Sequence, residues 1–159
     1  MVQDIQETAR RNNLTLHDRE YFTSKLELRE RAGDDVDISL LMADHEGEFL
    51  AAMFLILSKE RGTYLYGASS SRNRNLMATY AIQWEAMKIA RQSGCREYDM
   101  FGAAPNPSRS HPLYGLYRFK SGFGGSLFHR MGCWDYPLIR DEYLAFRARE
   151  TQNQKYHAN

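Results

Sequence analysis

Apolar and polar residues follow two different spacings along the chain, and the change between them predicts the order of the elements. Residues 1–32 carry apolar residues at helical spacing among many charges, which predicts two helices. From Val36 the pattern changes to short apolar runs separated by turn residues. The runs cover residues 38–43, 49–57 and 63–66. They predict three consecutive antiparallel strands.

A long helix and a returning strand are predicted next. Apolar residues on most faces between Leu76 and Ser93 predict a largely buried helix, and Gly94 stands where a left-handed cap is expected. Residues 97–101 predict a strand parallel to the third one, because a helical crossover separates the two. The remaining pattern predicts a short helix at 116–122, a strand at 126–136 and a charged helix from Arg140 onward.

This order of elements is similar to that of the GNAT acyltransferase fold. We therefore expect one α/β (α+β) domain over residues 1–159, with a mixed, mostly antiparallel sheet flanked by helices. Its parts are two N-terminal helices at 1–32, a core of sheet and helix at 36–138 and a C-terminal helix at 140–155. A likeness of fold does not by itself fix a function.

Composition narrows the class of protein. The 159 residues are 43% hydrophobic and 26% charged, which is typical of a soluble globular protein. The longest apolar run, Phe49 to Leu57, is too short for a membrane span, and the residues after Met1 lack the pattern of a secretory signal. Cys95 and Cys133 form neither a metal-binding spacing nor a disulfide framework. We expect a cytoplasmic protein without a metal site.

Charge is distributed unevenly along the chain. Residues 1–71 contain eight basic and thirteen acidic residues, whereas residues 72–130 contain nine basic and three acidic ones. A net charge near +6 in the middle segment favours an anionic partner there. The alternative is that solvated faces simply differ in sign.

The loop before the long helix argues against the usual cofactor of the GNAT fold. GNAT enzymes usually hold acyl-CoA with a loop of the form Q/R-x-x-G-x-G/A, whose backbone N–H groups close on a pyrophosphate. Residues 71–78 contain no glycine, so we expect no CoA. The serines and arginines of this loop are suited to phosphate contacts, or the loop merely caps the helix through Asn75.

The stretch YRFKSGFGG at 117–125 places two cations between aromatic rings. It is not a phosphate-binding P-loop, because Lys120 precedes its glycines. Phe119 offers a flat ring on which a base can stack, and Arg118 and Lys120 offer cations to a nucleic-acid backbone or an oxyanion. The alternative is that Tyr117 and Phe119 belong to the core while the two cations are solvated.

Three stretches together resemble the FemABX family of aminoacyl-tRNA-dependent transferases. They are LYGASSSRNRNLMATYAIQWEAMKIARQSGCREYDMFG, HPLYGLYRFKSGFGG and GCWDYPL, within residues 64–138. The resemblance implies transfer of an amino acid from aminoacyl-tRNA to a side-chain amine of a peptidoglycan precursor, a nucleotide- or lipid-linked muropeptide. No other cofactor is implied.

The resemblance also implies roles for individual residues. Phe119 would stack on the 3′ end of the tRNA, and Lys120 would neutralise charge forming on the ester carbonyl. Further substrate contacts are implied at Arg118, Tyr98, Arg72, Arg74 and Tyr117. Asp99 and His111 have chemical side chains too, but a strand-end carboxylate and a histidine before a proline are more typical of structural roles.

Family members contain two GNAT-like domains, and the resemblance covers the second one. The missing first domain has three explanations: the chain is a fragment of a longer protein, it pairs with itself as a homodimer or with another GNAT-like half, or it uses a different amine acceptor. Two other functions stay open. One is a non-catalytic module that binds tRNA ends or muropeptides, and the other is an acyl-CoA N-acyltransferase.

Overall fold

The computed structural model describes residues 20–24, 27, 35–106, 108–132 and 134–153. Its elements are β1 (Val36–His45), β2 (Glu48–Ser58), β3 (Arg61–Ser69), the 3-10 turn η2 (Arg74–Leu76), α3 (Ala78–Gln92), β4 (Glu97–Asp99), α4 (Tyr114–Ser121) and α5 (Arg140–Asn153). They divide into two units, residues 1–123 and 124–159, which are described separately. Residues 20–24 and 27 are helical, and the rest of the two helices predicted over 1–32 lies outside the described residues.

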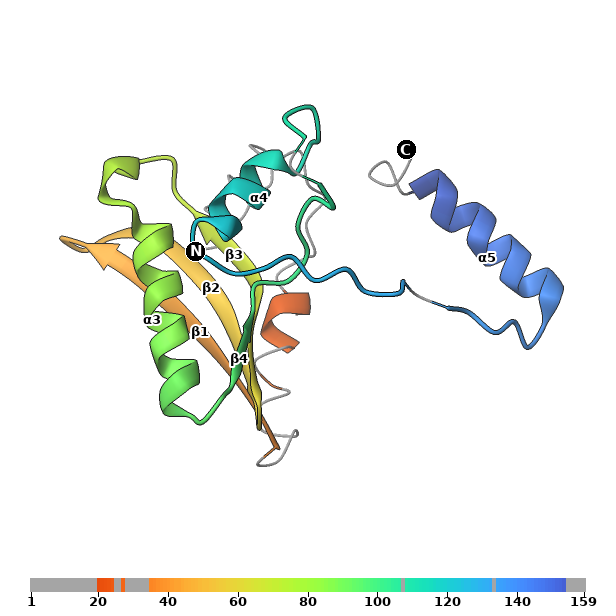
Figure 1. Ribbon diagram of the computed structural model, residues 1–159, viewed down its shortest axis with the longest axis horizontal. Coiled ribbons are helices and arrows are strands. Elements are labelled where there is room, and N and C mark those ends of the chain that lie inside the picture. The colour runs from red at the N-terminus through yellow and green to blue at the C-terminus, as the bar shows by residue number, and fades with distance from the viewer. Residues whose placement is uncertain (1–19, 25–26, 28–34, 107, 133, 154–159) are drawn as a thin grey trace. The chain divides into compact units, whose positions relative to one another are not determined.

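The sheet of the first unit has the strand order β1-β2-β3-β4 (Figure 1). The first three strands pair antiparallel, and β4 pairs parallel to β3, as the sequence predicts. Glu46 and Gly47 connect β1 to β2 with φ angles of 52° and 79°, the left-handed values that a tight hairpin turn of two residues requires. The two hairpins are local structures, which is why the sequence pattern finds them.

Helix α3 packs with its small residues against one face of the sheet (Figure 1). The core consists of Ala51, Met53, Leu55 and Leu57 from β2 and Ile82, Ala86 and Ala90 from α3. Gly94 ends the helix region at a φ of 86°, the predicted left-handed cap. The prediction of a largely buried helix is wrong, however, because Trp84 is 63% and Met77 50% exposed. Only one stripe of α3 meets the sheet, and its outer face keeps large apolar residues.

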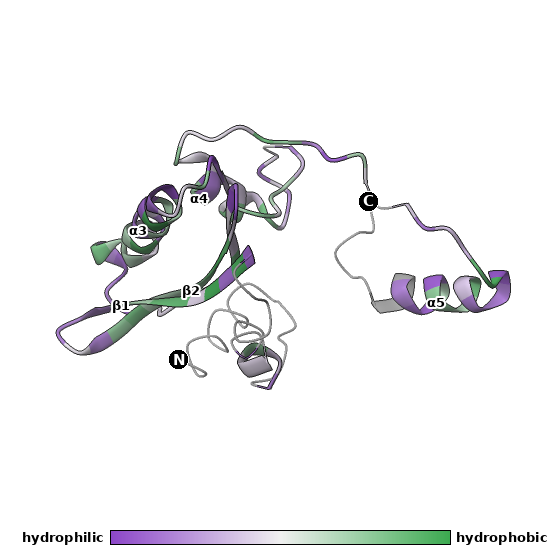
Figure 2. Ribbon diagram, turned by 90° about the horizontal axis from the view of Figure 1, so that it is seen from below, coloured by the Kyte–Doolittle hydropathy of each residue, from purple (hydrophilic) through white to green (hydrophobic). Residues whose placement is uncertain are grey.

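The opposite face of the sheet is covered by aromatic residues. Phe22 stacks on Phe54 with 5.9 Å between ring centroids, and the hydroxyl groups of Tyr21 and Tyr66 lie 2.9 Å apart. Burial and the neighbouring phenol raise the pKa of Tyr66 to about 12. Figure 2 shows α3 and α4 together on one side of the sheet. The sheet therefore has two different apolar faces, and only one of them meets α3.

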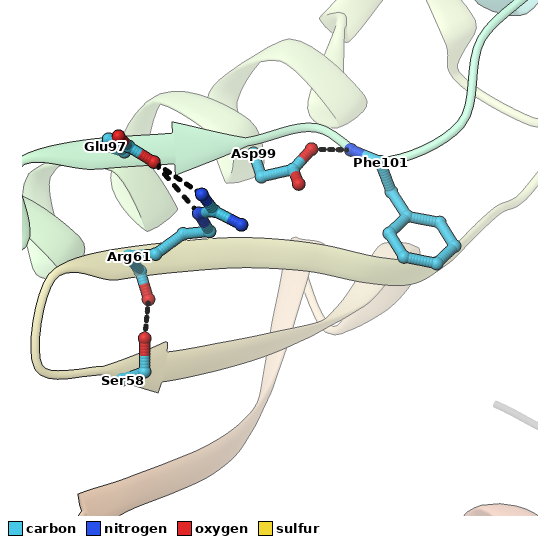
Figure 3. Close-up of polar contacts among 5 residues, drawn as sticks. All are labelled: Ser58, Arg61, Glu97, Asp99 and Phe101. Carbon is cyan, nitrogen blue, oxygen red and sulfur yellow. Dashed lines mark hydrogen bonds and ion pairs between the residues drawn. The ribbon is translucent and has the colours of Figure 1, made fainter. Parts of the chain in front are cut away.

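Polar contacts fix the short strand β4 beside β3 (Figure 3). Arg61 binds the carboxylate of Glu97 through Nε at 2.9 Å and Nη2 at 2.8 Å, a forked contact across the first pair of the ladder. At the end of β4, Asp99 accepts a hydrogen bond of 2.7 Å from the backbone N–H of Phe101, whose φ is 63°. The carboxylate thus closes a turn that redirects the chain, as the sequence interpretation of Asp99 predicts.

The second unit differs from the sequence prediction in one respect. Residues 126–132 and 134–136 form no strand, although the sequence predicts one over 126–136. A strand needs a partner edge, and no ladder reaches this part of the described chain. Its large apolar side chains are accordingly exposed, with Trp134 at 83% and Tyr136 at 88%.

Helix α5 confirms the charged helix predicted from Arg140. The hydroxyl of Tyr143 donates to Asp135 at 2.9 Å, which joins the start of α5 to the segment before it. Arg147 and Glu150, one turn apart, form an ion pair. No helix in the described ranges combines the length and apolar character needed to cross a bilayer.

Candidate active site

Lys120 is held by two contacts that come from different elements. It lies near the end of α4, and its ammonium group donates a hydrogen bond of 2.5 Å to the carbonyl oxygen of Gly102, in the segment after β4. The same Nζ lies 5.4 Å from the centre of the Tyr64 ring on β3. The side chain is partly buried. A cation is thus placed where α4 meets the sheet.

The surroundings of Lys120 change its affinity for the proton. Partial burial lowers the pKa of Lys120 to about 8, and the nearby carboxylate of Asp99 opposes that shift. The carboxylate of Asp99 and the phenol ring of Tyr64 lie near it. Near neutral pH Lys120 therefore carries its charge in a partly desolvated place. Such a lowered pKa beside defined partners is typical of functional lysines.

Tyr98 supports this region from β4. Its hydroxyl donates a hydrogen bond of 2.8 Å to Oε1 of Gln83, a residue of α3 that is only 1% exposed. Burial, with a smaller contribution from Tyr64, raises the pKa of Tyr98, and burial raises the pKa of Tyr64. Both phenols are neutral at physiological pH. The hydroxyl of Tyr98 contacts Gln83 inside the fold, so a role for Tyr98 in binding a muropeptide stays a prediction.

Phe119 belongs to a cluster of three aromatic rings. Its ring meets Tyr80 edge-on at 5.0 Å and Phe123 edge-on at 5.5 Å, while Tyr80 and Phe123 stack at 5.4 Å. Phe119 is partly buried, so it is neither a fully exposed ring for base stacking nor a fully buried core residue. The cluster joins α4 to α3. Stacking of Phe119 on a base stays a prediction.

The loop before α3 is tied to the start of β2. Arg72 forms an ion pair of 2.8 Å with Glu48, and the side-chain amide of Asn73 donates to the other oxygen of Glu48 at 2.6 Å. Arg72 is therefore already paired with a carboxylate, whereas Arg74 is exposed in η2. The capping role weighed for Asn75 is wrong. Asn75 lies inside η2, and Met77 precedes α3 with a φ of 54° and no side-chain cap.

The remaining candidates lie around α4. Arg118 is exposed, and the ring of Tyr117 stacks on that of Tyr114 at 6.5 Å. Nδ1 of His111 accepts a hydrogen bond of 3.0 Å from the N–H of Leu113, which confirms its structural role. Cys133 lies outside the described residues. Within the described ranges no group of three or more histidine, cysteine or acidic side chains is placed to hold a metal.

Two groups of the site escape the sequence interpretation, namely the ring of Tyr64 and the carbonyl of Gly102. The sequence pattern indicates only that Tyr64 is an apolar residue of a strand, and no sequence pattern identifies a backbone carbonyl as part of a site. The only signal was the pair Tyr64 and Tyr66 followed directly by Gly67. Of the predicted residues, Lys120 and Tyr98 both lie near Tyr64, whereas the ring of Phe119 contacts Tyr80 and Phe123.

A mixed sheet of this order with α3 packed on one face is the fold of GNAT-like acyltransferases. The solved structure of FemX matches 90% of this chain and 51% of its own with a TM-score of 0.74 at 20% identity. The aminoglycoside 6′-N-acetyltransferase AAC(6′)-Ig of Acinetobacter haemolyticus matches 86% of this chain and 92% of its own, with a TM-score of 0.57 at 16% identity. Both matches show the fold.

The family follows from sequence similarity. The model of the FemAB family matches residues 24–150, so this chain belongs to the FemAB family. It is 36% identical over 108 residues to the "Lipid II:glycine glycyltransferase" of Staphylococcus haemolyticus, covering 67% of this chain. A protein of the same name in Staphylococcus aureus strain USA300 is 34% identical over 108 residues. The matched region spans only 26% of the length of either relative.

Proposed function

We propose that this chain carries the acyl-transfer site of an aminoacyltransferase of peptidoglycan synthesis. The donor is an aminoacyl-tRNA, and the acceptor is an amine of a lipid- or nucleotide-linked muropeptide. The observation that carries the proposal is the position of Lys120, a cation held between the Gly102 carbonyl and the Tyr64 ring. The names of the relatives support a lipid-linked acceptor and a small amino acid such as glycine.

The chemistry makes few demands on the protein. The acceptor amine attacks the carbonyl carbon of the aminoacyl ester, and the carbonyl oxygen takes the negative charge. The C–O bond to the tRNA ribose then breaks, the ribose oxygen takes the proton from the amine, and an amide remains. Because the ester is already activated, positioning and one cation lower the barrier enough. The ammonium group of Lys120 is the cation that would face the oxyanion.

The donor loop favours tRNA over CoA. Residues 71–78 have no glycine, and Met77 stands with an exposed side chain at the N-terminus of α3. Side chains there obstruct the close approach of backbone N–H groups to a pyrophosphate. Arg72 is also already paired with Glu48. These features support a donor that is not held by a Gly-rich loop.

The acceptor is proposed to need more protein than this chain offers. The chain corresponds to about half of FemX and about a quarter of the glycyltransferases. A second GNAT-like domain, or a second copy of the chain, would supply the remaining acceptor contacts. This part of the proposal is independent of the role of Lys120.

Transfer assays with Lys120 variants test the proposal. The native protein is incubated with glycyl-tRNA and a lipid-linked muropeptide, and both ester loss and amide product are measured. Removing an oxyanion donor typically lowers kcat by about a hundredfold or more, so Lys120→Met is expected to lose transfer. Lys88→Met, at an exposed lysine on α3 paired with Glu85, is the matched control and should transfer normally.

The outcomes distinguish an aminoacyltransferase from a non-catalytic binding module and from an acyl-CoA transferase. Loss of ester with amide formation, dependent on Lys120, supports the enzyme. Binding of charged tRNA or of muropeptide without transfer would instead identify a non-catalytic module. Tight binding of CoA in a calorimeter would favour an acyl-CoA transferase. Full activity of Lys120→Met would end the assignment of its role.

A further inference from the structure

An extra residue in β3 directs Tyr64 toward Lys120. The register pairs Leu55 with Tyr64 but Phe54 with Tyr66, so β3 has one residue more than β2 at this point. In a regular strand residues two apart lie on the same face, whereas here Tyr64 packs against the core beneath α3 and Tyr66 against Phe22 on the other face. Bulges of this kind commonly re-aim a side chain beside an active site.

Gly67 provides the space in which the Tyr64 ring lies. A Cβ atom at Gly67 would stand 2.2 Å from the Tyr64 hydroxyl oxygen and 2.8 Å from Cε2 of its ring. Any other residue at position 67 would therefore displace the ring. Gly67 is not one of the glycines with a positive φ angle, so its backbone conformation does not require glycine. The close approach of Tyr64 does.

We propose that Tyr64 is a positioning residue for Lys120, seated by the bulge of β3 and by Gly67. The ring lies 5.4 Å from Nζ, and the carbonyl of Gly102 accepts one of the three N–H bonds of the ammonium group. An aromatic face attracts a cation through its quadrupole and takes up no proton. The ring thus holds the charged form of Lys120 while an N–H bond stays available for the ester oxygen. This inference rests on the proposed function.

Substitutions of Tyr64 in the native protein test the role. Tyr64→Phe keeps the ring face and is expected to retain kcat within about twofold, whereas Tyr64→Leu is expected to lower kcat about tenfold with KM for aminoacyl-tRNA unchanged. Gly67→Ala, which displaces the ring, is expected to act like Tyr64→Leu. Equal activity of the Leu and Phe variants, with Lys120→Met inactive, would overturn the role of Tyr64 alone. An active Lys120→Met would instead overturn the proposed function.

A second measurement needs no variant of Tyr64 and no turnover. Lysines of the wild-type protein are converted to ¹³C-dimethyllysine, and the Lys120 signal is assigned by its absence in Lys120→Met. A ring beneath the ammonium group shifts its methyl signals upfield of those of the exposed lysines. A Lys120 signal at the position of the exposed lysines would show that the ring does not hold the side chain, and would overturn the inference even if Tyr64→Leu failed to fold.

Discussion

Lys120 should lower the stability of the folded protein at neutral pH, and Lys120→Met should recover part of it. The pKa of Lys120 is about 8 in the fold against an ordinary value of 10.5. Such a shift corresponds to about 3 kcal/mol if fully expressed. Because the side chain is only partly buried, solvent screening reduces this to about 1–2 kcal/mol. Lys120→Met removes the charge and keeps an apolar chain of similar length.

The pH dependence gives the sign of the effect. Between about pH 8 and the ordinary value of 10.5, the unfolded chain binds more protons at Lys120 than the folded protein does. The free energy of unfolding of the wild type therefore rises with pH in this window. Below it both states are protonated, and the full penalty is present. In the folded protein the phenols of Tyr64 and Tyr98, whose pKa values are raised, keep their protons in this window. The unfolded chain loses those protons first, so both phenols lower the free energy of unfolding as the pH rises through their ordinary value of 10.0.

Urea unfolding near pH 7 and near pH 9.5 measures the difference. The wild type should gain about 1 kcal/mol relative to Lys120→Met between the two conditions. Lys88→Met, which removes an exposed ammonium group, should follow the wild type. Parallel pH profiles of the wild type and Lys120→Met would refute the reasoning, because they would mean that Lys120 titrates alike in both states. If Lys120→Met is more stable and less active than the wild type, Lys120 serves function at a cost in stability.

Two further predictions concern the packing that supports the site. Gly62→Ala should destabilise the fold by about 1–3 kcal/mol, because the new Cβ would stand 2.7 Å from Cβ of Ala90. Gly115→Ala is the control: position 115 in α4 has open space around it, so this variant should be neutral or stabilising. Thermal unfolding of both variants measures the difference. Tyr98→Phe should destabilise by about 1–3 kcal/mol, because it leaves Oε1 of the buried Gln83 without its donor. An unchanged melting temperature for Tyr98→Phe would contradict the importance of that hydrogen bond.

The sequence predicted the elements whose information is local. The hairpin of β1 and β2, helix α3 with its Gly94 cap and the parallel return of β4 each follow from spacing and turn residues within a short stretch. The strand predicted at 126–136 failed because pairing depends on an edge supplied elsewhere. Asn75 failed as a cap because η2 uses it in a turn of its own. Neither partner edges nor 3-10 turns are visible in a hydrophobic pattern.

The candidate site was predictable only in its residue types. A ring, a cation and glycines in one stretch indicated Phe119 and Lys120, but their neighbours come from β3 and from the segment after β4. The one residue inserted in β3 decides which tyrosine faces Lys120, and alternation alone assigns Tyr64 and Tyr66 to the same face. A register shift is a property of two strands, so a single strand's sequence cannot report it.

The short pairing of β3 with β4 leaves the carbonyl of Gly102 outside the ladder. The parallel ladder covers Arg61–Thr63 and Glu97–Asp99, and the turn closed by Asp99 then leads the chain away from β3. Beyond this point the Gly102 carbonyl accepts from Lys120 of α4. Ligands of open sheets with parallel strands bind beyond the carboxyl ends of those strands. A longer β4 would carry the carbonyl of residue 102 into the ladder, so the early turn at Asp99 is what leaves this carbonyl for Lys120.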